Sequence, residues 1–168
     1  NRYTPLLIEG NSDRGIDIGF LVKTSLDLKT ELRSHKDRPL NFAYPHEQLN
    51  HISRTHYFSR DCAELRILDD QGRPQLFILL VHLKSKLDPE GIDPEGKSRR
   101  QAEVKMLVNI YLELRQKEAK QVPVIVAGDF NGCAKKSAQA EEFIDLATTD
   151  LEGITDLLNF DDQAAATQ

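Results

Sequence analysis

The sequence predicts a single α/β domain, and two observations favour this class. Short β-rich runs fill the first half of the chain, and several are bounded by turn residues. A long amphipathic helix follows, and after it comes a short apolar strand. The length of 168 residues, with 39% hydrophobic residues, suits one domain with a real core.

The N-terminal third is expected to contribute short strands. Residues 6–8 are apolar, and residues 15–22 alternate apolar with polar side chains, which is typical of a strand with one buried face. Residues 29–50 contain two prolines and show no clear period. We therefore expect a loop there, with at most a short strand.

An antiparallel hairpin is predicted next. Residues 56–68 and 75–83 both have strand character, and the turn-rich segment 69–74 separates them. Because residues 75–83 form a nearly continuous apolar run, this strand is expected to be buried on both faces.

The long helix is predicted over residues 98–119, with Ser98 as its N-cap. Charged side chains occupy one face of this segment, and the other face is expected to pack on the sheet. The apolar stripe consists of Ala102, Met106, Leu107, Ile110, Tyr111 and Leu114. Beyond it, we expect a buried strand over residues 123–127 and a shorter helix over residues 138–147.

Composition excludes several classes of protein. The net charge of −5 argues against tight passive binding to nucleic acid or an anionic membrane, although an enzyme could still meet phosphates through a divalent metal. Cys62 and Cys133 are too few for a disulfide framework. No segment approaches the ~18 apolar residues of a membrane helix, so no membrane segment is expected. The chain starts with neither Met nor a secretory signal, which favours a processed product or an excised piece and leaves the compartment open.

Polar side chains at the ends of two buried strands are the candidate site. His82 ends the first strand, and Asp129 and Asn131 follow the second between Gly128 and Gly132. A core histidine and a pair of turn residues are the alternatives. Residues i and i+2 of an extended segment point the same way, and a helical crossover brings both strand ends to one side of the sheet. His, Asp and Asn together would suit phosphoester hydrolysis.

Four segments resemble motifs of the endonuclease/exonuclease/phosphatase superfamily, the group of deoxyribonuclease I. They are Val81–Ser85 (VHLKS), Ala127–Asn131 (AGDFN), Arg14–Leu21 (RGIDIGFL) and Phe58–Asp61 (FSRD). Their order and spacing fit along nearly the whole chain. The resemblance implies a four-layered α/β/β/α sandwich of the deoxyribonuclease I-like type, here incomplete at both ends.

The resemblance also implies roles for individual residues. Asp129 would position and deprotonate the attacking water or lie close to Mg²⁺ or Mn²⁺, and Asn131 would hold a phosphate oxygen or complete the metal shell. His82 would donate a hydrogen bond to the phosphate. The implied activity is metal-dependent hydrolysis of a phosphoester substrate, either nucleic acid or a small phosphorylated molecule. Arg60 and Asn11 are weaker candidates for substrate contact. For both of them, and for Asp13, a surface or loop role is favoured.

Two family motifs are missing from the sequence. A Gln-Glu strand should precede these segments and a Ser-Asp-His segment should follow them, but Glu9 lacks a preceding Gln and no histidine follows Gly128. We therefore expect the chain to be the middle of a domain, with little activity of its own. The alternative is a non-catalytic binding domain that keeps the same fold.

Overall fold

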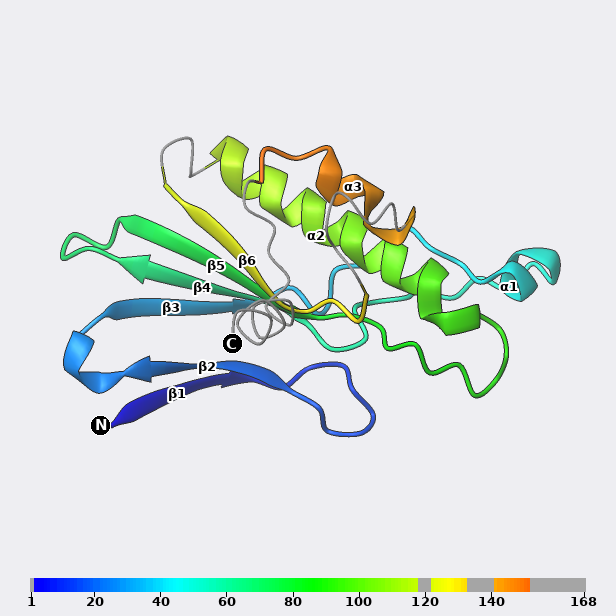
Figure 1. Cartoon of the computed structure of the whole chain (residues 1–168), viewed down its shortest axis with the longest axis horizontal. Helices are drawn as coiled ribbons and strands as arrows, with labels where there is room; N and C mark the ends of the chain where they lie inside the picture. The colour runs from blue at the N-terminus through cyan, green and yellow to red at the C-terminus, as the bar shows by residue number, and fades with distance from the viewer. Residues whose placement is uncertain (1, 118–121, 133–140, 152–168) are drawn as a thin grey trace, which may run out of the picture.

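The computed structural model describes residues 2–117, 122–132 and 141–151. Two β-sheets form the framework, and a long helix lies along one side of the larger sheet (Figure 1). The strands are β1 (Tyr3–Ile8), β2 (Ile18–Lys23), β3 (Lys29–Ser34), β4 (Cys62–Leu68), β5 (Pro74–His82) and β6 (Val124–Asp129). The helices are α1 (Pro45–Leu49), α2 (Lys97–Lys117) and α3 (Ile144–Ala147), with 3-10 turns at Thr24–Leu26, Pro94–Gly96 and Glu141–Phe143. The predicted α/β class is confirmed.

Strand order places β5 and β6 side by side. β1 and β2 form an antiparallel two-stranded sheet, and the second sheet has the order β3-β4-β5-β6. Within it, β3, β4 and β5 are antiparallel neighbours, as predicted for the β4–β5 hairpin, whereas β6 runs parallel to β5. Parallel pairing requires a crossover connection, and α2 provides it.

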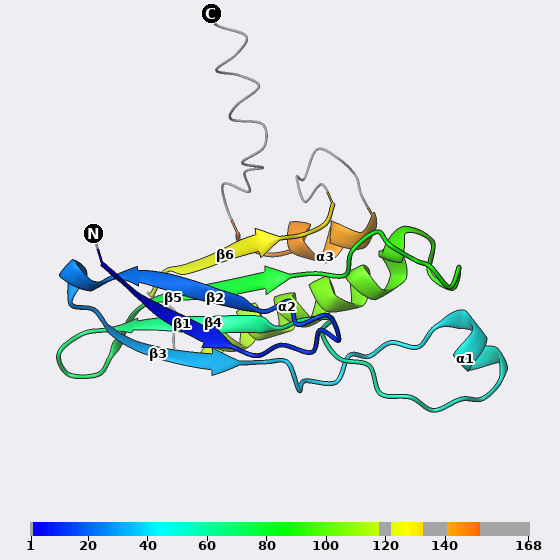
Figure 2. The same ribbon diagram turned by 90° about the horizontal axis from the view of Figure 1, so that it is seen from below.

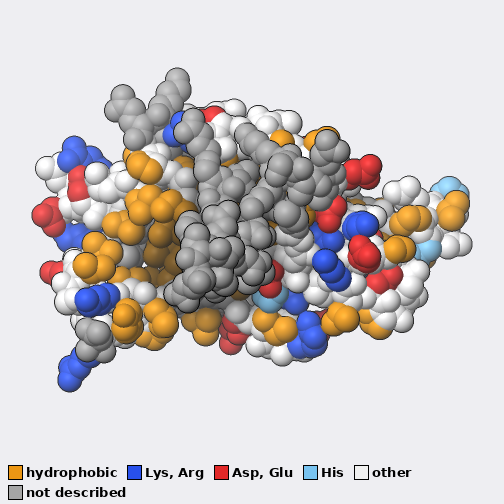
Figure 3. Space-filling view, viewed as in Figure 1, with side chains coloured by type: hydrophobic (Ala, Val, Ile, Leu, Met, Phe, Trp, Pro, Cys, Tyr) orange, Lys and Arg blue, Asp and Glu red, His pale blue; other side chains and the backbone are white. Residues whose placement is uncertain are grey.

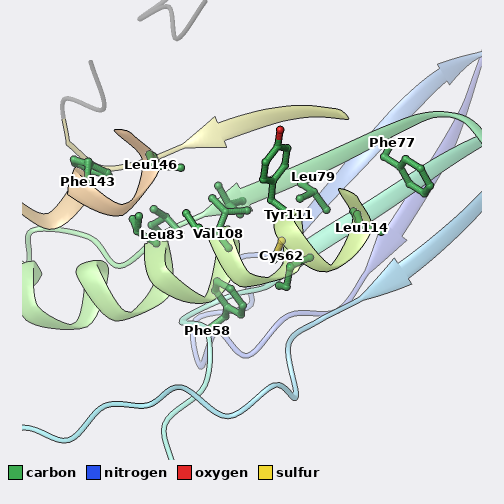
Figure 4. Packing of buried hydrophobic residues seen from close by; sticks show 14 residues of the cluster. Phe58, Cys62, Phe77, Leu79, Leu83, Val108, Tyr111, Leu114, Phe143 and Leu146 are labelled. Carbon is green, nitrogen blue, oxygen red and sulfur yellow. The ribbon is translucent and has the colours of Figure 1, made fainter. Parts of the chain in front are cut away.

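The main core lies between α2 and one face of the four-stranded sheet. Phe77, Leu79 and Val81 of β5 are buried against the apolar side of α2, which includes Val104 and Leu107. Figure 4 shows this packing, with side chains from α2, β5 and the segment around α3 in contact. The opposite face of the sheet meets the β1–β2 hairpin, where β2 lies against β5, and Figures 1 and 2 show the helix and the hairpin on opposite sides.

The expectation that β5 is buried on both faces is wrong. Leu76, Ile78 and Leu80, which point away from α2, are only half-buried, and Ile125 of β6 is 47% exposed. The reason is that a two-stranded hairpin is too narrow to cover a four-stranded sheet. Hydrophobic side chains gather over the strands on the left of Figure 3.

Two details of α2 correct the sequence prediction. Ser98 is not the N-cap, because the carboxylate of Asp93 accepts hydrogen bonds from the backbone N–H groups of Ser98 and Arg99 and satisfies the first turn. The buried face is centred on the side of Val104 and Leu107, so Met106 is only half-buried. The predicted residues 118 and 119 of this helix lie outside the described residues.

The segment between β3 and β4 contains structure that the sequence did not predict. β3 is a full strand, and α1 begins at Pro45, a residue suited to the first helical turn. Buried Glu47 accepts a hydrogen bond from the Tyr44 backbone N–H and contacts His56 at 2.8 Å, which fastens α1 to the following segment. His56 pairs with Leu40 in an isolated bridge rather than starting a strand.

The predicted helix over residues 138–147 is described from residue 141 only. There it consists of a 3-10 turn followed by α3, and both Phe143 and Leu146 are buried. Residues 138–140 lie outside the described residues. Across the described ranges, no helix combines the length and apolar character needed to cross a bilayer.

Candidate functional site

His82 and Asp129 meet at the edge of the sheet where β5 and β6 both end. They are register partners in the parallel pair, and His82 Nε2 lies 3.8 Å from Asp129 Oδ2. Gly128 permits this approach, because its φ is +137° and a Cβ there would lie 1.9 Å from the Val81 carbonyl oxygen. The strand–helix–strand crossover therefore brings these two predicted residues together.

The charge of His82 is set by its surroundings. Burial lowers the pKa of His82, and the nearby guanidinium groups of Arg60 and Arg14 lower it further, whereas Asp129 opposes them. The lowered pKa favours the neutral imidazole form of His82. The Asp129 carboxylate is 62% exposed, so one side of this pair faces solvent.

Asn131 does not follow the predicted extended geometry. β6 ends at Asp129, and Asn131 adopts a left-handed backbone conformation with φ +50°. Its backbone N–H donates to Asp129 Oδ1 at 2.8 Å, and its side-chain Nδ2 donates to the Leu83 carbonyl at 2.9 Å. The residue thus forms a tight turn that still holds its carboxamide beside the end of β5. Asn131 is therefore both a turn residue and a neighbour of the His82–Asp129 pair.

Arg60 joins the same group from the segment before β4. Its side chain is 4% exposed, and Nη1 donates to the Leu83 carbonyl at 3.1 Å. Leu83 therefore accepts hydrogen bonds from both Arg60 and Asn131, and its own N–H donates to the Asp129 carbonyl at 2.9 Å. One backbone residue links three of the predicted site residues.

Asn11 has a structural task in this arrangement. Its side-chain Nδ2 donates to the carbonyls of Lys36 and Phe58, and its backbone N–H donates to the Arg60 carbonyl. It holds the β1–β2 loop against the segment that carries Arg60, which agrees with the loop role favoured from the sequence. Asp13, in the same loop, is exposed.

Sequence reasoning missed Glu103, a fully buried carboxylate on α2. It accepts hydrogen bonds from the Ser59 backbone N–H and hydroxyl and from the Lys84 backbone N–H. Burial raises the pKa of Glu103, although these donors oppose the rise. The sequence could have predicted the burial of Glu103, because this residue lies one helical turn before Leu107 on the apolar side of α2.

Hard oxygen donors at this edge fit a divalent cation. The exposed Asp129 carboxylate offers one, and the Asn131 carboxamide oxygen offers another, because the amide nitrogen is engaged by Leu83. Considering only the described residues, no group of three or more His, Cys, Asp or Glu side chains is placed to enclose a metal ion.

Comparison with known proteins gives no assignment: no protein-family model matches the chain, and no curated protein matches it.

Proposed function

We propose that this chain carries the hydrolytic core of a metal-dependent phosphoesterase of the endonuclease/exonuclease/phosphatase superfamily. The supporting observation is the pairing of His82 with Asp129 at the ends of adjacent parallel strands, with Arg60 and Asn131 held beside them through the Leu83 carbonyl. A base, hydrogen-bond donors and a buried cation at one edge of a sheet suit attack of water on a phosphate.

Each side chain has a defined part in the proposed reaction. The Asp129 carboxylate orients the attacking water and accepts its proton, and the neutral His82 imidazole donates a hydrogen bond to a phosphate oxygen. A bound phosphate brings negative charge close to His82, which favours its protonated form and strengthens that contact. Arg60 compensates charge on the phosphate from the buried side. Asp129 and Asn131 would hold Mg²⁺ or Mn²⁺, which would supply Lewis-acid activation.

The finer fold also belongs to this proposal. The sheet face opposite α2 carries half-buried Leu76, Ile78 and Leu80, together with exposed Ile125. Apolar surface of this kind normally packs against another layer. We propose that the β1–β2 hairpin is part of a second sheet that completes a deoxyribonuclease I-like four-layered sandwich.

Hydrolysis of bis-nitrophenyl phosphate tests the proposed function. The assay compares the 168-residue chain with the protein encoded by the whole gene, each with Mg²⁺, Mn²⁺ or a chelator. We expect chelator-sensitive turnover by the whole protein and little by the chain alone. Asp129→Ala should reduce this turnover by at least about 10²-fold. The matched control is Asp70→Ala, which removes a fully exposed carboxylate paired with Lys29 and should leave the turnover unchanged.

The outcome also separates enzyme from binding domain. Metal-dependent turnover that survives Asp129→Ala would contradict the site. No turnover by the whole protein, combined with retained phosphate binding, would instead support the non-catalytic domain.

A further inference from the structure

A basic groove lies beside the candidate site and shares Arg60 with it. Its volume is ≈ 680 Å³, and its walls come from the β1–β2 loop, the segment before β4, the loop after β5 and the first turn of α2. The cationic lining residues are Arg14, Arg60, Lys84 and Arg99, and Asp13 is the acidic one. The groove is therefore positive although the chain carries a net charge of −5.

The cations of the groove are held mainly by neutral groups. Arg60 donates to the Leu83 carbonyl, Lys84 to the carbonyls of Ser85 and Leu87, and Arg99 to the Tyr57 carbonyl. In the part of the chain that the structure describes, Arg14, Arg60 and Lys84 form no ion pair with a carboxylate. Arg99 does approach a carboxylate, with its Nε 3.8 Å from Glu103 Oε1.

The like charges also repel one another. Burial lowers the pKa of Lys84, and Arg99 and Arg60 lower it further, whereas Asp93 and Glu103 oppose the shift. Burial lowers the pKa of Arg60, and Arg14 and Arg99 lower it further, against the opposing effects of Glu103 and Asp129. Clustered cations that have mainly neutral partners attract an anion, because a bound anion offsets this repulsion.

The groove is also firmly built. Fully buried Glu103 holds the Ser59 and Lys84 backbones, so two walls are fixed by one side chain. Both of these backbone hydrogen bonds are accepted by the carboxylate oxygens of Glu103. Tyr57, which is 38% exposed, adds an aromatic surface to the lining. Cations next to an exposed ring suit a phosphate attached to an organic group.

We propose that this groove is a second phosphate-binding site. It takes a phosphate of the substrate other than the one that is hydrolysed, an assignment that rests on the proposed hydrolase function. Arg60 contributes to both places, since it lines the groove and shares the Leu83 carbonyl with Asn131. The substrate therefore carries at least two phosphates, as in a nucleic-acid strand or a small diphosphorylated molecule.

Binding measured without metal tests the groove separately from catalysis. In the presence of a chelator, the chain is titrated with pyrophosphate by calorimetry and with a short single-stranded oligonucleotide by fluorescence anisotropy. Arg14→Gln and Lys84→Gln should each weaken pyrophosphate binding about tenfold. Arg14→Glu, at an exposed position, should abolish it with folding intact. The controls Arg33→Gln and Lys105→Gln, both on exposed positions outside the groove, should change it less than twofold.

Each outcome decides the proposal. Oligonucleotide binding that Arg14→Glu abolishes assigns the groove to a strand, and pyrophosphate binding alone assigns it to a small diphosphorylated molecule. The proposal is overturned if pyrophosphate does not bind, or if the controls weaken binding as much as the groove variants do. No turnover is involved, so a failure of the proposed hydrolase function would leave this result standing.

Discussion

The buried carboxylate of Glu103 accepts a hydrogen bond from the backbone N–H of Lys84 at 2.6 Å. Its other oxygen accepts from the Ser59 backbone N–H at 2.7 Å and from the Ser59 hydroxyl at 2.6 Å. A single side chain of α2 thus fixes the spacing between the segment that leads into Arg60 and the segment that follows His82. The positions of both site residues depend on this carboxylate.

Glu103→Gln should therefore be costly in spite of its similar shape. A carboxamide has only one oxygen, so its NH₂ group must face at least one of the backbone N–H donors. We expect the free energy of unfolding to fall by about 2–3 kcal/mol, measured by urea denaturation. Glu113→Gln removes a half-exposed partner of Arg38 and should cost less than about 1 kcal/mol. Equal losses of unfolding free energy for the two variants would contradict the role of Glu103 in fixing the spacing of these two segments.

Gly128→Ala should destabilise the protein and displace Asp129. The added Cβ would lie 1.9 Å from the Val81 carbonyl oxygen, so β6 must move away from β5. We expect a loss of at least about 3 kcal/mol, measured by thermal unfolding. Gly15→Ala is the matched control, because Gly15 also has a positive φ but has no atom within 4 Å of a built Cβ. Its cost should be the backbone strain alone, about 1–2 kcal/mol.

Introducing an aspartate into α2 should destabilise the protein more, the more deeply the replaced side chain is buried. Ile110 is 1% exposed, so Ile110→Asp should cost about 3–5 kcal/mol by burying an unpaired carboxylate. Met106 is half-buried, and Met106→Asp should cost clearly less because its carboxylate can reach water. Lys105→Ala, at an exposed position, should be within about 0.5 kcal/mol of the unmodified protein. Equilibrium denaturation that ranks Lys105→Ala as the costliest change would contradict the helix phase.

Acid should weaken the fold through Glu64. Burial opposes ionisation of this residue, but hydrogen bonds with His35 and Arg66 outweigh it and lower its pKa below the ordinary 4.5. A lowered folded-state pKa gives stability that is present above pH ~4.5 and is lost as the pH falls through the folded-state value. Glu64→Gln should reduce the acid dependence between about pH 5 and pH 3, measured by urea unfolding across that range. An unchanged dependence would show that other carboxylates account for it.

The sequence could predict which distant residues come together wherever the order of strands and helices alone determines their positions. His82 and Asp129 end strands that a helix connects, and this connection forces the two strand ends to one edge. Asn131 was predicted in the right place but in the wrong conformation, because a single left-handed residue leaves no periodic signal. Glu103 was missed because a charged residue in an amphipathic helix normally indicates a solvent-exposed face.

The burial of a strand could not be predicted from its own sequence, because burial depends on which element covers each face. The apolar run of β5 indicates a buried strand, but among the described residues a narrow two-stranded hairpin is what covers the face that carries Ile78 and Leu80. Periodicity gives the chemical character of a face and not the width of the layer that meets it. The short helix α1 was missed for another reason, since a five-residue helix that begins at Pro45 is too short to show an apolar stripe.

The parallel pairing of β5 with β6 has a consequence for folding kinetics. The β4–β5 hairpin closes across a short turn, whereas β6 can pair with β5 only after the whole of α2 has been accommodated. Closing so long a loop makes this pairing slow relative to local contacts. No peptide that covers only the hairpin can assemble the His82–Asp129 edge. On refolding, phosphate binding that depends on this edge should return no earlier than the slowest structural phase, and its recovery would report completion of the chain's topology.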